Sequence, residues 1–231
     1  MRINKYIAQS GICSRRKAEE LIKDKRVEVN GIIVDDLSFK VDKDDTIFVD
    51  GKRIDIENKF YYKLNKPVGY ISSNYDPHNN KNLETLLDID QRFFCAGRLD
   101  MDSHGLMIIT NDGYMVNRLI HPKFEVKKEY IVKVDKLLNN KQEYLFEKPL
   151  KLGHGQIAYK QELKIINKKD KIYKVIISQG YKRQIRRMFA MFSSQVIDLK
   201  RIKIGQIELG NLEDGSYEKL SKKEMEFLSS L

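Results

Sequence analysis

The first fifty residues alternate short apolar runs with strongly charged ones. Apolar residues recur at helical spacing first in INKYI and again in RRKAEELIKDKR, and Ser14 stands where the N-cap of the second helix is expected. Asn-Gly and Asp-Gly pairs then separate the β-branched runs of VEVNGIIV and DDTIFVDGKRI, a strong signal for two hairpins. The pattern predicts two short helices followed by a small sheet over 1–50, with a polar linker at 51–59.

From residue 60 the apolar positions take on the alternation of strands. The segment YYKLNKPVGYISS predicts a strand, a Pro-Gly turn and a second strand, and a polar loop follows at 74–82. KKEYIVKV, ELKIIN and KIYKVIIS alternate as strands, whereas 113–120, 182–192 and the closing SKKEMEFLSSL have helical spacing. Because strands dominate and are spaced as hairpins, we expect an α+β domain on a largely antiparallel mixed sheet over 60–231.

The charge of the chain favours an anionic partner. Its 231 residues contain 43 Lys and Arg against 33 Asp and Glu, a formal net charge of +10. Such a balance is typical of nucleic-acid binding and less often of binding to an acidic membrane face, although a solvated basic surface gives the same count. No apolar run is long enough for a signal peptide or a membrane span, so a cytoplasmic protein without a membrane partner is expected. Two isolated cysteines favour neither disulfides nor zinc.

Cations gather at the start of the second predicted helix, where the helix dipole disfavours them. Free backbone amides at a helix start attract phosphate, so this cluster favours a phosphate-binding surface over an ordinary solvated helix face. The candidate RNA-binding residues of this module are Arg2, Lys5, Ser14, Arg15, Arg16, Lys17, Arg26 and Asn30.

The stretch GRLDMDSHGL places two acids two residues apart, and four interpretations are open. A metal site would need further ligands, and only Asp112 and His104 stand near. An aspartyl-phosphate nucleophile would require Ser or Thr where this chain has His104. The third interpretation is one catalytic Asp held by a loop that Gly97 and Gly105 allow to turn tightly, and the fourth is an acidic surface turn.

Two later stretches add context. Tyr130 is central in the strand KKEYIV, where a tyrosine is commonly a core residue with a hydrogen-bonded hydroxyl. In SQGYKRQIRRMF three arginines crowd one helical turn, an unfavourable arrangement unless they meet phosphates or a buried carboxylate. Downstream cations extend this basic stretch to Lys203, and they face Asp198 as their one acid.

Two resemblances follow from these motifs. ICSRRKAEELIKDKRVEVNG is similar to the S4 RNA-binding domain, which implies RNA binding through the basic helix and the adjacent hairpin. In order, YYKLNKPVGYISS, GRLDMDSHGLMIITNDG, KKEYIV, QGYKRQIRRMF and LKRIKIGQIELGNLEDG resemble the pseudouridine synthases that carry an S4 domain and modify ribosomal RNA. The forms around Asp100 and Arg186 look like the F-type branch, which acts on RNA of the large ribosomal particle, although Gln179 and Tyr181 depart from the common motif with Glu before the Gly and a basic residue after it.

The resemblance implies roles for particular residues. Asp100 is the expected catalytic carboxylate, as nucleophile at C1′ or base at C2′, Tyr130 would stack on the target base, and Arg186 would pair with Asp100. Asp102 falls at a variable position. Arg98 would contact RNA or assist base flipping, or else form a salt bridge with an adjacent Asp. Further RNA contacts are expected from Lys182, Arg183 and Arg187.

The implied reaction turns uridine into pseudouridine without oxidation or hydrolysis, so no cofactor or metal is expected. The expected partner of this bacterial-type enzyme is ribosomal RNA, foremost 23S, with 16S and transfer RNA as alternatives. No obligate protein partner is expected, and we expect a monomer. The rival function is a non-catalytic RNA-binding or ribosome-assembly protein of the same fold, and a metal-dependent phosphotransferase ranks below it.

Overall fold

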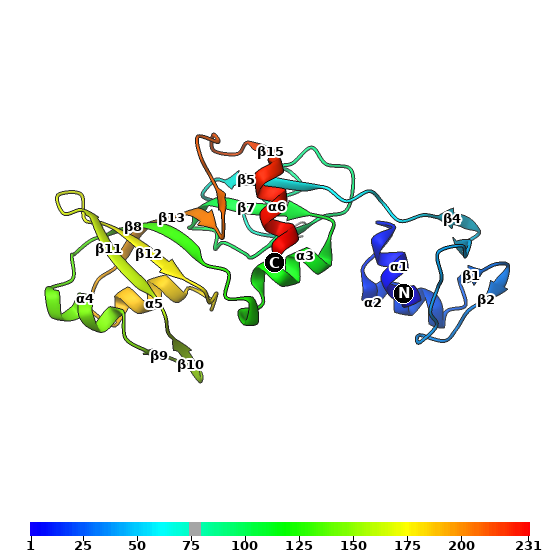
Figure 1. Cartoon of the computed structure of the whole chain (residues 1–231), viewed down its shortest axis with the longest axis horizontal. Helices are drawn as coiled ribbons and strands as arrows, with labels where there is room; N and C mark the ends of the chain where they lie inside the picture. The colour runs from blue at the N-terminus through cyan, green and yellow to red at the C-terminus, as the bar shows by residue number, and fades with distance from the viewer. Residues whose placement is uncertain (74–79) are drawn as a thin grey trace. The chain divides into compact units, whose positions relative to one another are not determined.

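The computed structural model describes residues 1–73 and 80–231 and divides them into two compact units (Figure 1). Unit 1 consists of Met1–Phe60 and Ile89–Phe93, and unit 2 contains the rest of the described chain. Most of the polar loop predicted at 74–82 lies outside the described residues.

Unit 1 has the predicted order of two helices followed by a small sheet. Its elements are α1 (Ile3–Gln9), α2 (Arg15–Lys23), β1 (Val27–Val29), β2 (Ile32–Ile33), β3 (Ile47–Val49) and β4 (Lys52–Ile54). The strands form an antiparallel sheet in the order β2-β1-β3-β4 over a core that includes Ile3, Ile22 and Ile47. The predicted linker at 51–59 overlaps β4, because Asp50 and Gly51 adopt positive φ and turn the chain back onto β3.

A short segment returns to unit 1 from further along the chain. Residues Ile89–Phe93 belong to this unit, and Arg92 Nη1 donates a hydrogen bond to Cys13 O at 3.1 Å. The apolar pattern of the sequence contains no signal for this return.

Unit 2 is built on a sheet that is nine-stranded in the described part of the chain. Its strands are β5 (Tyr61–Lys66), β6 (Phe94–Ala96), β7 (His104–Thr110), β8 (Lys128–Val134), β11 (Glu162–Asn167), β12 (Ile172–Ile177), β13 (Val196–Ile204), β14 (Ile207–Glu208) and β15 (Tyr217–Lys219). The order is β11-β12-β8-β13-β7-β5-β15, with β6 on β7 and β14 on β13. Only β13 and β7 pair in parallel among the described strands, which confirms an α+β fold on a largely antiparallel sheet.

Helices pack on both halves of this sheet (Figure 1). They are α3 (Gly113–Ile120), the 3₁₀ turn η1 (Pro122–Phe124), α4 (Asn140–Phe146), α5 (Gln184–Ala190) and α6 (Lys222–Ser230). α3 and α6 help to enclose an aliphatic core with Leu106 and Ile204. On the other half, Phe146 of α4 and Tyr173 of β12 each pack against Phe189 of α5, at ring distances of 4.8 and 5.6 Å.

Three parts of unit 2 differ from the prediction. The helix α4 and the hairpin of β9 (Leu150–Gly153) and β10 (Gln156–Ala158) were not predicted. Residues 70–73 form no strand, although the backbone groups of Ile71 and Ser73 bond Lys81 O and Leu83 N. No helix among the described residues is long and apolar enough to cross a membrane.

Candidate active site

A pocket of about 550 Å³ opens in unit 2, and its lining includes Asp100 and Tyr130, two of the three residues predicted to be catalytic, but not Arg186. Asp100 enters it from the loop between β6 and β7, and Tyr130 from the middle of β8. The end of β12 and the segment before α5 supply further walls through Ile177 and Tyr181. Elements distant in sequence therefore meet at one cavity.

The loop that carries Asp100 is held in place by hydrogen bonds from a buried lysine. Lys66, at the end of β5, is fully buried, and its Nζ donates to Pro67 O at 3.0 Å, Ser103 O at 2.8 Å and Asp100 O at 3.4 Å. Burial lowers the pKa of Lys66 to about 8, although the Asp102 and Asp100 charges oppose this effect. At the far end of the loop Gly105 has φ +101°, and a Cβ there would lie 2.2 Å from Arg201 O. Glycine is thus required where β7 meets β13.

The two acids of this loop have different surroundings. The Asp102 carboxylate accepts from Arg183 Nη1 at 3.2 Å and Nη2 at 3.0 Å, and it lies 3.3 Å from Arg186 Nη2. Partial burial opposes it, but these hydrogen bonds and charges hold the pKa of Asp102 below its ordinary value. The Asp100 side chain is 35% exposed, and its closest charged contact is Arg183 Nη1 at 4.0 Å. Asp102 is thus the acid engaged by arginines, and Asp100 is the one that lines the pocket.

The structure corrects the predicted partner of Asp100. Arg186 does not pair with it, because its guanidinium donates to Asp102 O at 2.8 Å, Ser103 Oγ at 3.3 Å and Val196 O at 2.8 Å. These bonds tie the loop to α5 and β13. The arginine nearest Asp100 is Arg183, which precedes α5 with a positive φ of +52°. Sequence reasoning placed Arg183 among the RNA contacts, since spacing alone does not tell which of two arginines faces the acid.

Tyr130 lies on the buried face of β8 between two other strands. Its backbone is in register with Val175 of β12 and Arg201 of β13, and its side chain is 7% exposed. Alternation along β8 places Lys128 on the same face as Tyr130, and both line the pocket. The two neighbouring strands fix the position of Tyr130, and an aromatic ring that lines the pocket can stack on a planar ligand.

Two buried cations that sequence reasoning did not assign to the pocket also line it. Lys128 is 6% exposed, and Arg201 is 1% exposed with Nε donating to Leu106 O at 2.6 Å. Arg201 belongs to the basic stretch that extends to Lys203, but its buried guanidinium donates to the backbone carbonyls of Leu106 and Gly97 and not to the surface. The only available signal was its same-face spacing with Leu199 in the alternating strand.

A second hollow of about 540 Å³ shares residues with the first and is mostly basic. It is lined by His154, Gln156, Lys182, Arg183, Arg186, Arg187 and Ala190. Arg187 Nη1 donates to Gln156 Oε1 at 2.8 Å and to Lys182 O at 3.2 Å, and Nη2 donates to Leu152 O. Arg187 thereby fastens the β9–β10 hairpin to α5, so only part of its guanidinium faces the hollow.

Arg98 lines the first pocket and is exposed. Within the described residues its guanidinium has no hydrogen bond or ion pair, so the predicted alternative of a salt bridge to Asp100 or Asp102 is not what the structure shows. The Asp102 carboxylate instead forms ion pairs with Arg183 and Arg186.

The candidate RNA-binding residues of unit 1 fall into two groups. Some have their polar groups engaged: Ser14 Oγ caps α2 by accepting from Lys17 N, Arg26 makes a bidentate ion pair with Asp50 at 2.6 and 2.7 Å, and Asn30 bonds Asp45 and Thr46. Arg15 donates to Asn4 Oδ1 at 3.5 Å, and Lys17 pairs with Glu20 at 2.7 Å. The exposed side chains of Arg2, Lys5 and Arg16 have no charged partner among the described residues.

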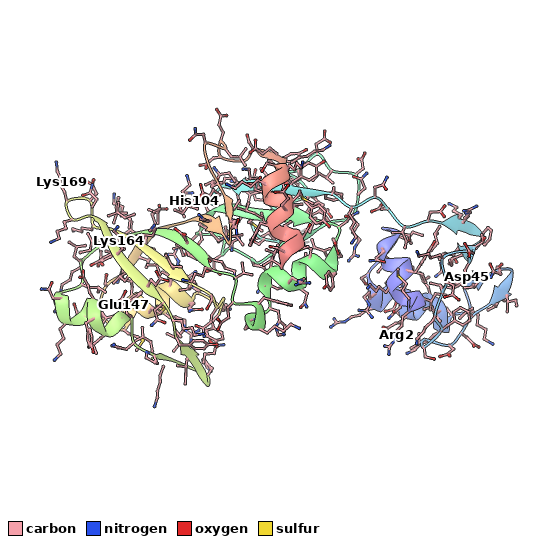
Figure 2. The ribbon with its side chains drawn as sticks, viewed as in Figure 1. Arg2, Asp45, His104, Glu147, Lys164 and Lys169 are labelled. Atoms are coloured by element: carbon pink, nitrogen blue, oxygen red, sulfur yellow. The ribbon has the colours of Figure 1, made fainter. Side chains whose placement is uncertain are left out.

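The acids and histidine considered for a metal have other partners. Asp112 caps α3 and accepts from Tyr61 Oη at 2.8 Å. His104, which is labelled in Figure 2, has Nε2 3.0 Å from Asp198 Oδ1. In the described part of the chain, no three His, Cys, Asp or Glu side chains form a cluster that could hold a metal ion.

Comparisons with known proteins agree with this architecture. The family described as RNA pseudouridylate synthase matches residues 61–191, and the S4 domain matches residues 1–47. The chain therefore belongs to the RNA pseudouridylate synthase family, whose members are isomerases, and it begins with an S4 domain. This confirms both resemblances drawn from the motifs.

Individual relatives cover nearly the whole chain. Ribosomal large subunit pseudouridine synthase B of Bacillus subtilis is 38% identical over 100% of this chain and 96% of its own length. The dual-specificity RNA pseudouridine synthase RluF of Escherichia coli K12 is 32% identical over 97% of this chain and 77% of its own. A crystal structure described as a pseudouridylate synthase superposes with a TM-score of 0.72 at 31% identity, covering 99% of both chains.

Proposed function

We propose that this enzyme isomerises a uridine of 23S ribosomal RNA to pseudouridine and that Asp100 is its reacting carboxylate. The observation that carries the proposal is the common pocket of Asp100 and Tyr130 in a chain whose full length matches a synthase named for the large ribosomal subunit. The identity to this relative, which is named for the large ribosomal subunit, exceeds the identity to the relative named for dual specificity, and this favours a single target in 23S RNA.

The geometry supports a division of labour in the pocket. Asp100 is the accessible acid and acts at the ribose, as nucleophile at C1′ or as base at C2′. Tyr130 stacks on the uracil ring from the buried face of β8. Arg183 bridges from Asp102 toward Asp100, so it orients the reacting carboxylate, while Arg186 holds the loop.

A uridine can reach this pocket only after it has left the base stack, which costs a few kcal/mol. Contacts to the flanking RNA must supply that energy. We assign phosphate contacts to Arg98 at the pocket and to Lys182 and Arg187 at the neighbouring basic hollow, where Arg183 is already bound to Asp102. In unit 1 we assign them foremost to Arg2, Lys5 and Arg16, whose exposed charges remain available to a ligand.

The test is to map pseudouridines in ribosomal and transfer RNA from cells with the gene, without it, and with Asp100→Asn. One or more 23S sites should vanish in the last two strains, while the purified variant still binds RNA. Loss of sites only in 16S or transfer RNA would refute the 23S target. An Asp100→Asn strain with intact modification would refute the role of Asp100, and unchanged maps in all strains would favour the non-catalytic RNA-binding function.

A further inference from the structure

Lys128 is a buried cation in the pocket that the proposed roles leave unused. It begins β8 two residues before Tyr130, and both side chains lie on the same face of the strand and line the cavity. Only 6% of Lys128 is exposed. Burial of an ammonium group is costly, and an apolar side chain of similar length would fill this position without that cost.

The contacts of Lys128 leave donor capacity. Its Nζ lies 3.0 Å from Val126 O and 3.5 Å from Ser178 O, and no acid is among its partners in the described residues. An ammonium carries three N–H donors, so the two backbone carbonyls leave one for another acceptor. Burial and then the Arg201 charge lower the pKa of Lys128 to about 8, which still leaves it mostly protonated at neutral pH.

The reaction creates an acceptor in this pocket. When the N1–C1′ bond breaks, both bonding electrons stay with the uracil, and the negative charge spreads from N1 to the two carbonyl oxygens. Until C5 bonds to C1′, the electron deficiency at C1′ is relieved either by a bond to the Asp100 carboxylate or by loss of the C2′ proton. N1 then gains a proton and C5 loses one. The described lining contains five cations, Arg98, Lys128, Lys182, Arg183 and Arg201, against Asp100 as its acid.

We propose that Lys128 donates its remaining N–H to a carbonyl oxygen of the detached uracil and stabilises the anion while the base turns. This proposal rests on the proposed function, since it concerns the same pocket. Donors fixed where charge develops act strongly in a site that excludes water. The competing role is purely structural, a tie between the start of β8 and Ser178 after β12.

Lys66 provides a matched control. It is also a buried lysine bound to backbone carbonyls, and burial also brings its pKa to about 8, but it holds the Asp100 loop and is not part of the pocket lining. A structural lysine and an anion-stabilising lysine should differ in their sensitivity to the electronic character of the base.

The experiment compares single-turnover loss of the N1–C1′ linkage in two stem-loop RNAs, with uridine or 5-fluorouridine at the mapped position. Fluorine withdraws electrons and stabilises the detached base by itself. Lys128→Met should slow the uridine reaction by about 100-fold and the 5-fluorouridine reaction by about tenfold or less. Lys66→Met should slow both by the same factor, and Lys128→Arg should keep the wild-type ratio of the two rates. Thermal unfolding establishes that each variant is folded.

Equal losses on both RNAs for Lys128→Met, or no loss on uridine, would overturn the proposal. If Lys128→Met does not fold, the neutral Lys128→Gln is compared in the same way, and an unchanged rate ratio is then the refuting result. Absence of any reaction by the wild-type enzyme on either RNA would instead refute the proposed function.

Discussion

Asp100 and Asp102 stand two residues apart, and the structure predicts opposite consequences when each is replaced by asparagine. The substitution preserves shape and removes charge. The Asp102 carboxylate accepts two N–H groups from Arg183 and lies 3.3 Å from Arg186 Nη2, whereas the Asp100 carboxylate has its closest ion-pair contact, Arg183 Nη1, at 4.0 Å. Asp102→Asn should therefore mainly reduce stability, and Asp100→Asn should mainly abolish activity.

The expected loss for Asp102→Asn can be worked from exposure. Arg183 and Asp102 are 43% and 47% exposed, so their pair contributes at most about 1 kcal/mol. Arg186 is only 12% exposed, so loss of the negative charge beside it reduces stability further. We limit this loss to ~1 kcal/mol, because the bonds of Arg186 to backbone carbonyls remain. A total of about 2 kcal/mol lowers the unfolding temperature by roughly 4–8 °C. Asp100→Asn should change it by less than ~2 °C.

Activity should show the reverse order. Asp100→Asn should reduce the rate by more than about 10⁴-fold, because it removes the carboxylate that we propose as the reacting group. Asp102→Asn should lower the rate by on the order of tenfold, because Lys66 still holds the loop that carries Asp100. The assay is release of tritium from RNA labelled at C5 of uridine, paired with thermal unfolding by circular dichroism. A stable but inactive Asp102→Asn protein, or an active Asp100→Asn protein, would refute this reasoning.

The pH dependence gives a second check on Asp102. A carboxyl group with a lowered folded-state pKa stabilises the fold above its unfolded pKa of about 3.9, and the contribution disappears as the pH falls through the folded value. The stability gap between wild type and Asp102→Asn should be constant from about pH 5.5 to 8 and close below about pH 4. A gap that persists in acid would indicate a cause other than the carboxylate charge.

Three further outcomes are expected. The pKa of Lys66 is about 8 in the folded protein and about 10.4 in the unfolded chain, so the unfolded chain binds more protons between these values. The free energy of unfolding of the wild type, measured in urea, should therefore rise relative to that of Lys66→Met from pH 8 to pH 10. A difference that stays constant over this range would contradict the prediction. Gly105→Ala should destabilise the protein by more than about 3 kcal/mol because its Cβ would meet the Arg201 backbone, whereas Gly180→Ala, with open space, should change stability little. Arg16→Gln should reduce the slope of log K against log salt concentration for RNA binding by about one. Arg26→Gln should leave this slope unchanged, because the Arg26 guanidinium already pairs with Asp50. Equal slopes for the two variants would contradict the phosphate contact assigned to Arg16.

Local signals in the sequence account for much of the fold. The turn pairs at Asn30-Gly31 and Asp50-Gly51 defined both hairpins of unit 1, and the apolar periodicity of 113–120 and 182–192 located α3 and α5. The β9–β10 hairpin escaped prediction because its short strands have weak alternation, with burial that changes irregularly along them. The parallel pairing of β13 with β7 joins residues almost 100 positions apart, and no local pattern encodes it.

The site was predictable in kind but not in its contacts. Motif order located Asp100 and Tyr130, which the structure brings to one pocket. The sequence did not show that Arg183 rather than Arg186 faces Asp100, because α5 begins between them and the loop decides which side chain reaches the acid. It also did not reveal Lys128 as part of the pocket, since a lysine in an alternating strand is normally expected at the surface.

The bonds of Arg201 to the ends of the Asp100 loop also have a consequence for synthesis of the chain by the ribosome. Arg201 completes the pocket wall and binds carbonyls on either side of the Asp100 loop, yet it is translated about a hundred residues after that loop. The S4 domain at residues 1–47 emerges before the synthase domain at 61–191, and domains generally fold as units in the order of their synthesis. A nascent chain therefore acquires its RNA-binding module long before it can catalyse, and partial products of translation are expected to bind RNA without modifying it.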